Sequence, residues 1–162
     1  MGDWIDEEAG KDCKEREELE RKEYLRSIAT YWADLTSQIK QDVQKIQTTK
    51  EWAHIFERPI KVETTDRHGL RIIKTSYPAY CRITIENGGD DVTVTTQSQF
   101  HEKADVEHKT ETLLLDFNTL HTILTNGKDF FIIPEQAAAY ILGPLVKAIK
   151  DHVKFMAERN RV

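Results

Sequence analysis

The stretch of sequence with the most suggestive chemistry is residues 100–108, Phe-His-Glu-Lys-Ala-Asp-Val-Glu-His, with two imidazoles and three carboxylates. Such groups bind zinc and transfer protons. A metalloprotease helix, however, requires His-Glu-x-x-His, and Asp105 stands where the second histidine would be. His101, Asp105 and His108 are therefore candidates for a metal or catalytic site, but the mostly polar composition favours a solvated loop. We expect no metal and no cofactor.

A second candidate site is the basic segment 58–82, in which six Lys and Arg residues meet two acidic ones. Basic strands with aromatic side chains bind single-stranded nucleic acid. The residues that this interpretation assigns to binding are Arg58, Lys61, Arg67, Arg71, Lys74, Tyr77, Tyr80 and Arg82. The following segment, 83–117, holds eight acidic residues against Lys103 and Lys109. Pairing of opposite charges between neighbouring strands explains the same pattern, so nucleic-acid binding is an alternative and not the leading function.

The charge of the whole chain gives a polyanion-binding role no support. The net charge is −5, and residues 1–24 account for it with ten Asp and Glu against five Lys and Arg. The rest of the chain balances at eighteen of each. The two cysteines, Cys13 and Cys81, lie far apart without metal-like spacing, which predicts unpaired thiols in a reducing compartment. No apolar run is long enough to cross a bilayer, so we expect a cytoplasmic protein without membrane contact.

The elements that must position any site are organised around a predicted hairpin at residues 80–96. Apolar and polar residues alternate on both sides of Gly88 and Gly89, as in half-buried strands. A two-residue turn at these glycines would pair Ile85 with Val92 and place both on one apolar face. This geometry also requires at least one of the two glycines to have positive φ.

A long helix is predicted at the N-terminal end of the chain. Residues 6–24 are dense in charge and lack apolar periodicity, which is typical of a solvated helix or a disordered arm. From residue 25 onward an apolar stripe runs along one face, and six of its residues are expected to be buried: Leu25, Trp32, Leu35, Ile39, Val43 and Ile46. A heptad from Leu35 would continue at Asp42, whereas the stripe moves to Val43. That drift favours a straight helix on a sheet over a coiled coil.

The remaining elements follow from turn residues and periodicity. We expect a hairpin of strands 60–64 and 70–75, a strand at 110–117, a short helix between Asn118 and Gly127, a short strand at 129–133, and a helix from Pro134. Gly143 and Pro144 should kink this last helix, because Pro144 cannot donate a hydrogen bond to the carbonyl of Tyr140.

These patterns predict an α+β fold in which an antiparallel sheet of about five or six strands is covered by the long helix and by the kinked C-terminal helix. Residues 1–24 form the charged arm and residues 25–162 a single domain. The leading function is a non-enzymatic interaction protein, such as an adaptor, a chaperone-like binder or an inhibitor, because no catalytic constellation is present. The alternatives are nucleic-acid binding through residues 58–82 and a small-ligand or metal enzyme that uses residues 101–108. The partner is expected to be another protein. A homodimer is also expected, since the apolar surfaces of two long helices exceed what one small sheet covers.

Overall fold

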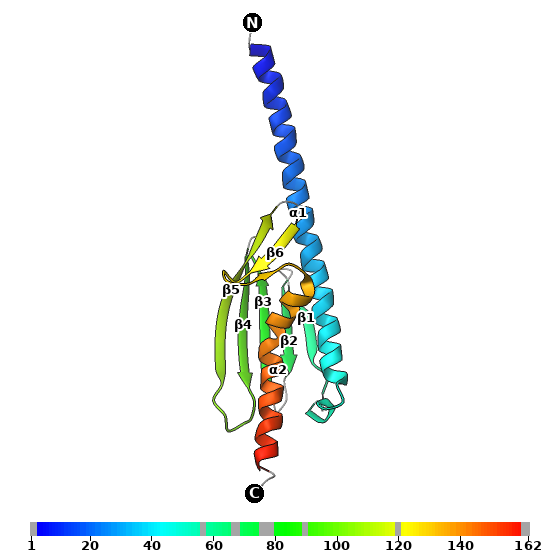
Figure 1. The fold of residues 1–162 in the computed structure, drawn as a ribbon, viewed down its shortest axis with the longest axis vertical. Coiled ribbons are helices and arrows are strands. Elements are labelled where there is room, and N and C mark those ends of the chain that lie inside the picture. Colours follow the sequence, from blue (N-terminus) through cyan, green and yellow to red (C-terminus); the bar gives the residue numbers. More distant parts are fainter. Residues whose placement is uncertain are drawn as a thin grey trace.

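The computed structural model describes residues 3–55, 58–65, 69–74, 80–88, 91–118 and 121–159. Two long helices and a sheet make up this part of the chain (Figure 1). The elements in order are α1 (Asp3–Thr48), a 3-10 turn (Ala53–Ile55), β1 (Lys61–Thr64), β2 (Leu70–Lys74), β3 (Tyr80–Asn87), β4 (Asp91–Gln99), β5 (Glu107–Asn118), β6 (His121–Thr125), β7 (Phe130–Phe131) and α2 (Pro134–Arg159). The α+β class with a long N-terminal and a C-terminal helix is confirmed.

The sheet is a seven-stranded antiparallel meander in which β1 to β7 are neighbours in sequence order. Its strand count exceeds the expected five or six because the segment predicted as a short helix is strand β6, paired with β5. The sequence of β6, His-Thr-Ile-Leu-Thr, is rich in β-branched residues, which favour strands. Asn126 and Gly127 form the turn into β7 and not a helix C-terminus, with Gly127 at a φ of 94°.

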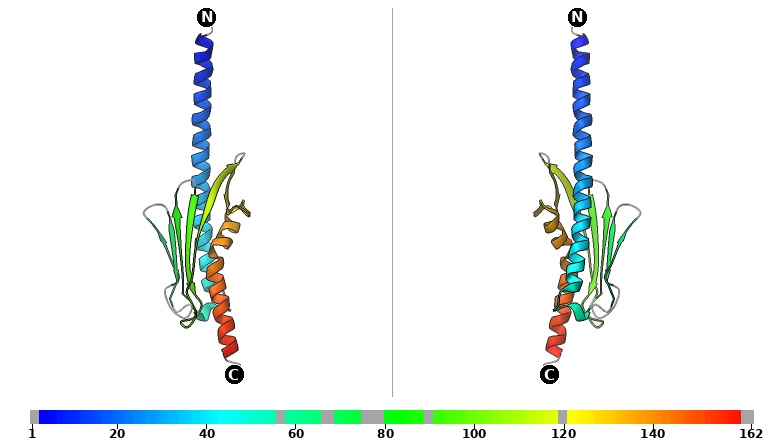
Figure 2. Two further views of the ribbon diagram at one scale, coloured as in Figure 1. Left: turned by 90° about the vertical axis from the view of Figure 1, so that its left-hand side faces the viewer. Right: turned by 90° about the vertical axis from the view of Figure 1, so that its right-hand side faces the viewer.

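Both helices lie on the same side of the sheet (Figure 2). Helix α2 contacts β3, β4 and β7, while α1 contacts β5, β6 and α2. We call the side under the helices the covered face; it carries the buried residues Ile72, Ile83, Ile85, Val94 and Leu113, among others. The opposite side, the open face, presents the alternating polar residues of β3, β4 and β5. The period-two alternation of these strands thus separates a core from a solvated surface.

The central hairpin forms, but its predicted register is wrong by two residues. Ile85 pairs with Val94, and Asn87 pairs with Val92. The backbone N–H of Gly88 donates to the carbonyl of Asp91 at 2.9 Å, so the pairing extends to Gly88 and Asp91, and Gly88 is not a central turn residue as predicted. A slip of two residues leaves every side chain on its predicted face, because strand side chains alternate with period two. A positive φ was predicted for at least one of the two glycines. Gly88 does not have a positive φ, and position 89 lies outside the described residues.

Helix α1 spans 46 residues and divides into an exposed and a buried half. Its buried residues are Tyr31, Leu35, Ile39, Val43 and Ile46. The predicted burial of Leu25 is wrong: this residue is 54% exposed, because the N-terminal part of α1 projects past the sheet (Figure 1) and the buried residues of the helix begin only at Tyr31. Trp32 is only half-buried. Tyr31, which the periodicity did not single out, is buried and donates its hydroxyl proton to the carbonyl of Phe131 at 2.9 Å.

Helix α2 begins at Pro134 as predicted and continues through Gly143 and Pro144 without interruption. Its axis changes direction within the orange part of the ribbon, which contains Pro144 (Figures 1 and 2). Proline in a helix interior removes one hydrogen bond and is a usual cause of such a bend. Among the described residues, no helix combines the length and the apolar character needed to span a membrane.

Candidate functional site

The residues predicted for nucleic-acid binding are divided between the two faces of the sheet. Lys61, Arg71, Tyr80 and Arg82 occupy open-face positions of β1, β2 and β3. Lys74 is on the covered face and only 3% exposed. Arg71 also lies 3.9 Å from the carboxylate of its cross-strand neighbour Glu63, as charge pairing between strands requires. Arg58 is exposed ahead of β1, and Arg67 and Tyr77 lie outside the described residues. Nucleic-acid binding stays a prediction.

The histidines of segment 101–108 point to opposite sides of the molecule. His101 is buried under α2, with its ring centroid 4.3 Å from that of Phe155, and its Nδ1 accepts the backbone N–H of Lys103 at 3.2 Å. His108 is exposed and pairs across the strands with Gln97, an open-face position. Asp105 is exposed in the connection between β4 and β5. Within the described ranges, no three His, Cys, Asp or Glu side chains come together to hold a metal ion.

Two buried imidazoles, His101 and His152, connect the C-terminal half of α2 with the loop after β4. The Nδ1 of His152 lies 3.0 Å from the carbonyl of Phe100, and this carbonyl can only accept, so Nδ1 carries the proton. His152 and His101 stack with ring centroids 6.2 Å apart. Burial lowers the pKa of His152, and the nearby charges of His101, Lys74 and His54 lower it further, against the opposing effect of the Phe100 carbonyl. The cluster therefore keeps His152 neutral and has a packing role.

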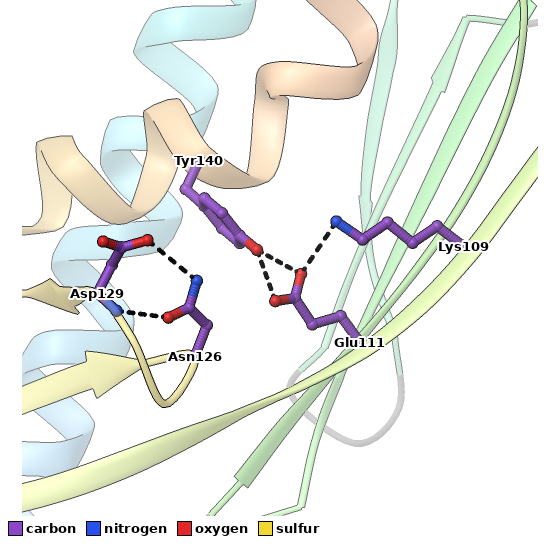
Figure 3. A network of polar contacts seen from close by, with 5 residues as sticks. All are labelled: Lys109, Glu111, Asn126, Asp129 and Tyr140. Atoms are coloured by element: carbon purple, nitrogen blue, oxygen red, sulfur yellow. Dashed lines mark hydrogen bonds and ion pairs between the residues drawn. The ribbon is translucent and has the colours of Figure 1, made fainter.

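The strongest candidate for a binding site is a cleft of about 380 Å³ between α2 and strands β4 and β5. The residues that line it are Val94, Thr96, Lys109, Glu111, Ala139, Tyr140, Ile141, Gly143 and Pro144. Val94 and Ile141 belong to the buried core and give the cleft an apolar floor. Lys109 and Glu111 come from β5, and Tyr140 comes from the first half of α2 (Figure 3). A mostly apolar cavity with a few converging polar groups is the usual form of a small-molecule site.

The polar groups of the cleft form one connected network. The Tyr140 hydroxyl lies 2.5 and 2.6 Å from the two carboxylate oxygens of Glu111 and donates its proton to them (Figure 3). The ammonium nitrogen of Lys109 lies 3.6 Å from Oε2 of Glu111 and 5.9 Å from the centroid of the Tyr140 ring. The Glu111 carboxylate thus accepts a hydrogen bond from a phenol and forms an ion pair with an ammonium group at the same time.

The same network keeps Tyr140 protonated. Burial raises the pKa of Tyr140, and the hydrogen bond to Glu111 and the negative charge of Glu111 raise it further. A hydrogen bond from Asn126 and the positive charge of Lys109 act in the opposite direction. Tyr140 is consequently a hydrogen-bond donor at neutral pH and not a general base. The arrangement can therefore bind and orient a polar group but carries no nucleophile paired with a base.

Pro144 forms part of the helical wall of this cleft. Because proline has no N–H, the carbonyl of Tyr140 loses its normal donor one turn later in the helix. Gly143, next to Pro144, leaves space: a Cβ atom built at this position would meet nothing within 4 Å. The Gly-Pro pair therefore lines the cleft with no side chain at position 143 and no backbone donor at position 144.

A second, more open cavity of about 580 Å³ lies between α1 and the edge of the sheet at β1 and β2. It is lined by Trp32, Thr36, Lys40, Thr65 and Gly69, among others. The Thr36 hydroxyl oxygen is buried and has no hydrogen-bond partner in the described structure. None of its described lining residues is acidic, so these residues lack the charged pair that distinguishes the cleft.

The third candidate binding surface is the exposed first half of α1, residues 3–24, which we call the arm. Nearly all of its side chains are exposed, including the large apolar residues Trp4, Ile5 and Leu19. Its ion pairs are local: Lys11 with Glu8 at 3.6 Å and Arg16 with Glu20 at 3.7 Å. Pairs at these spacings support an isolated helix but contribute little each. No other part of the described chain covers the arm (Figure 1).

Comparison of the chain with protein-family models, with curated proteins and with solved structures gives no match.

Lys109, Glu111 and Tyr140 were not among the site residues predicted from the sequence. A usable signal was present: Glu111 and Lys109 share the strand parity of Leu113, so a strand with an apolar face carries two charges on that face. Charged residues on a covered face need partners, and the break at Pro144 indicated where an opening would lie.

Proposed function

We propose that this protein is a non-enzymatic, cytoplasmic interaction module whose folded body presents the arm to another protein. The observation that carries the proposal is the 46-residue length of α1, of which only the second half is buried against the sheet and α2. Helices in water are marginal without packing, so a long exposed helix is most useful as a binding element. The free thiols of Cys13 and Cys81 support a reducing compartment.

The side chains of the arm indicate what kind of partner it would bind. Trp4 is 65% exposed, and Trp is among the residues that contribute most to protein interfaces. Trp4 and Leu19 lie about 60° apart around the helix and about 22 Å apart along it, on one side of the arm. Residues 1–24 have twice as many acidic as basic residues. These features favour a partner surface with apolar pockets for the two side chains and basic residues between them.

A photo-crosslinking experiment tests the proposal. A photoreactive amino acid in place of Asp12, in the middle of the arm, should crosslink a defined partner in the native cell. The same substitution of Lys154, which is exposed on α2, serves as the matched control and should not capture that partner. Light scattering of the purified protein distinguishes a second copy of the chain from a different protein, because a homodimer doubles the mass.

Affinity measurements with the purified partner then test the role of the apolar side chains. Replacement of Trp4 and Leu19 by Ala should weaken binding at least about tenfold, since two anchoring side chains are lost. Val106→Ala removes an equally exposed apolar residue outside the arm and should leave the affinity unchanged. Equal affinity of the partner for the protein lacking residues 1–20 would refute the proposal.

A further inference from the structure

We infer that the cleft between α2 and strands β4 and β5 binds a small primary alkylammonium ligand, with its charged end at Glu111 and its alkyl chain against Val94 and Ile141. This binding site is independent of the arm and of the function proposed for it. Glu111 is the group that would recognise the charge. Its side chain is 23% exposed and faces the cleft, and the hydrogen bond from Tyr140 fixes the orientation of its carboxylate.

The chain itself supplies an ammonium group at this position. Lys109 carries a primary ammonium on an alkyl stem, which is the chemistry of the proposed ligand. Its nitrogen lies 3.6 Å from Glu111 and 5.9 Å from the Tyr140 ring centroid, within reach of both an ion pair and a cation–π contact. The geometry around Glu111 and Tyr140 is thus already suited to an alkylammonium group.

Lys109 can be displaced at small cost. Its side chain is 65% exposed, and the 3.6 Å separation exceeds that of a charge-assisted hydrogen bond. Ion pairs of such exposed lysines contribute little to stability. When an external ammonium takes the place of the Lys109 nitrogen, Lys109 moves into solvent without leaving a buried charge unpaired.

The rest of the cleft suits a short alkyl chain. The volume of about 380 Å³ is in the range of small-ligand pockets. Val94 and Ile141 form the apolar floor, and the buried residue Thr96 also lines the cleft. A carboxylate ligand is disfavoured, because it would stand beside the negative charge of Glu111 and compete with that residue for Lys109.

Calorimetric titration with hexylammonium, hexanoate and hexanol tests the inference. We expect hexylammonium to bind at low ionic strength and at least about tenfold more tightly than either of the others, because only it pairs with Glu111. Glu111→Gln should lose this preference. The matched control is Glu107→Gln: Glu107 belongs to the same strand and pairs with Lys147 at the same 3.6 Å, but it does not line the cleft. Its replacement should leave the affinity unchanged.

Lys109→Ala is the more decisive variant, because the expected change is a gain in affinity, which misfolding of the variant would not produce. Removal of the competing ammonium should raise the affinity for hexylammonium by about two- to fivefold, the range expected for an exposed ion pair. Weaker binding of hexylammonium to this variant would overturn the inference, because it would make Lys109 part of the site. Tighter binding of hexanoate than of hexylammonium, or equal binding of hexanol, would also overturn it.

Discussion

The two halves of α1 are one continuous helix, but different forces stabilise them. In the second half, residues spaced three or four apart from Tyr31 to Ile46 are buried against β5, β6 and α2. Burial of each such side chain contributes about 1.5–3 kcal/mol. In the arm, local ion pairs and helix propensity act alone, at a few tenths of a kcal/mol per pair. Helical conformation by itself therefore does not indicate that a segment belongs to the folded core.

Truncation of a leucine in each half measures this difference most directly. Leu35→Ala should lower the free energy of unfolding by about 2–5 kcal/mol, because Leu35 is fully buried and its loss leaves a cavity. Leu19→Ala should change it by less than about 0.5 kcal/mol, since Leu19 is exposed. Urea denaturation followed by circular dichroism gives both values. Similar losses in the two variants would show that the arm is packed.

Two glycines extend the comparison to the backbone. A Cβ atom at Gly69 would collide with the backbone carbonyl of Ile85 in the neighbouring strand, whereas one at Gly10 in the arm would meet nothing. Gly69→Ala should destabilise the protein by about 1–3 kcal/mol through this overpacking. Gly10→Ala should raise the helix content of the arm without lowering the melting temperature, because alanine is the better helix former. Thermal melts of both variants distinguish the sites, and an unchanged melting temperature for Gly69→Ala would contradict the close approach.

The pH dependence of stability sharpens the contrast between buried and exposed positions. Burial lowers the pKa of His152 in the folded protein, whereas the unfolded chain has the ordinary value of 6.5. The unfolded state therefore binds the proton more readily, and stability should fall as the pH drops below 6.5. His152→Asn should flatten this dependence, while His108→Asn, at an exposed position, should retain it. Melting temperatures measured from pH 8 downward test the sign; a slope that survives in His152→Asn would assign it to other groups.

Much of the fold could be predicted because period-two and helical patterns extend over many residues. The faces of β3 and β4 follow from alternation alone, and a register error of two residues did not alter them. The register itself depended on which residues form the turn: the hydrogen bond between Gly88 and Asp91 replaces the predicted turn at Gly88 and Gly89. The segment of β6 was too short for its apolar pattern to separate helix from strand, and pairing with β5 decides it.

The cleft could not be predicted in the same way, because its residues come from separate elements. Glu111 and Tyr140 lie on β5 and α2, and only the packing of α2 over the sheet brings the phenol to the carboxylate (Figure 3). The residue of α1 at which burial begins could not be predicted from the sequence either. Leu25 continues the apolar stripe in the sequence, but it is exposed, and the buried residues of the helix begin only at Tyr31.

Amide hydrogen exchange along α1 tests the central claim most directly. Exchange protection reports the free energy of local opening at each residue. We expect the amides of residues 3–24 to exchange rapidly and those of residues 31–46 to be protected to nearly the level of the strands. Addition of the partner captured through Asp12 should then protect the arm and leave the second half unchanged. Uniform protection of the whole helix in the isolated protein would contradict the account.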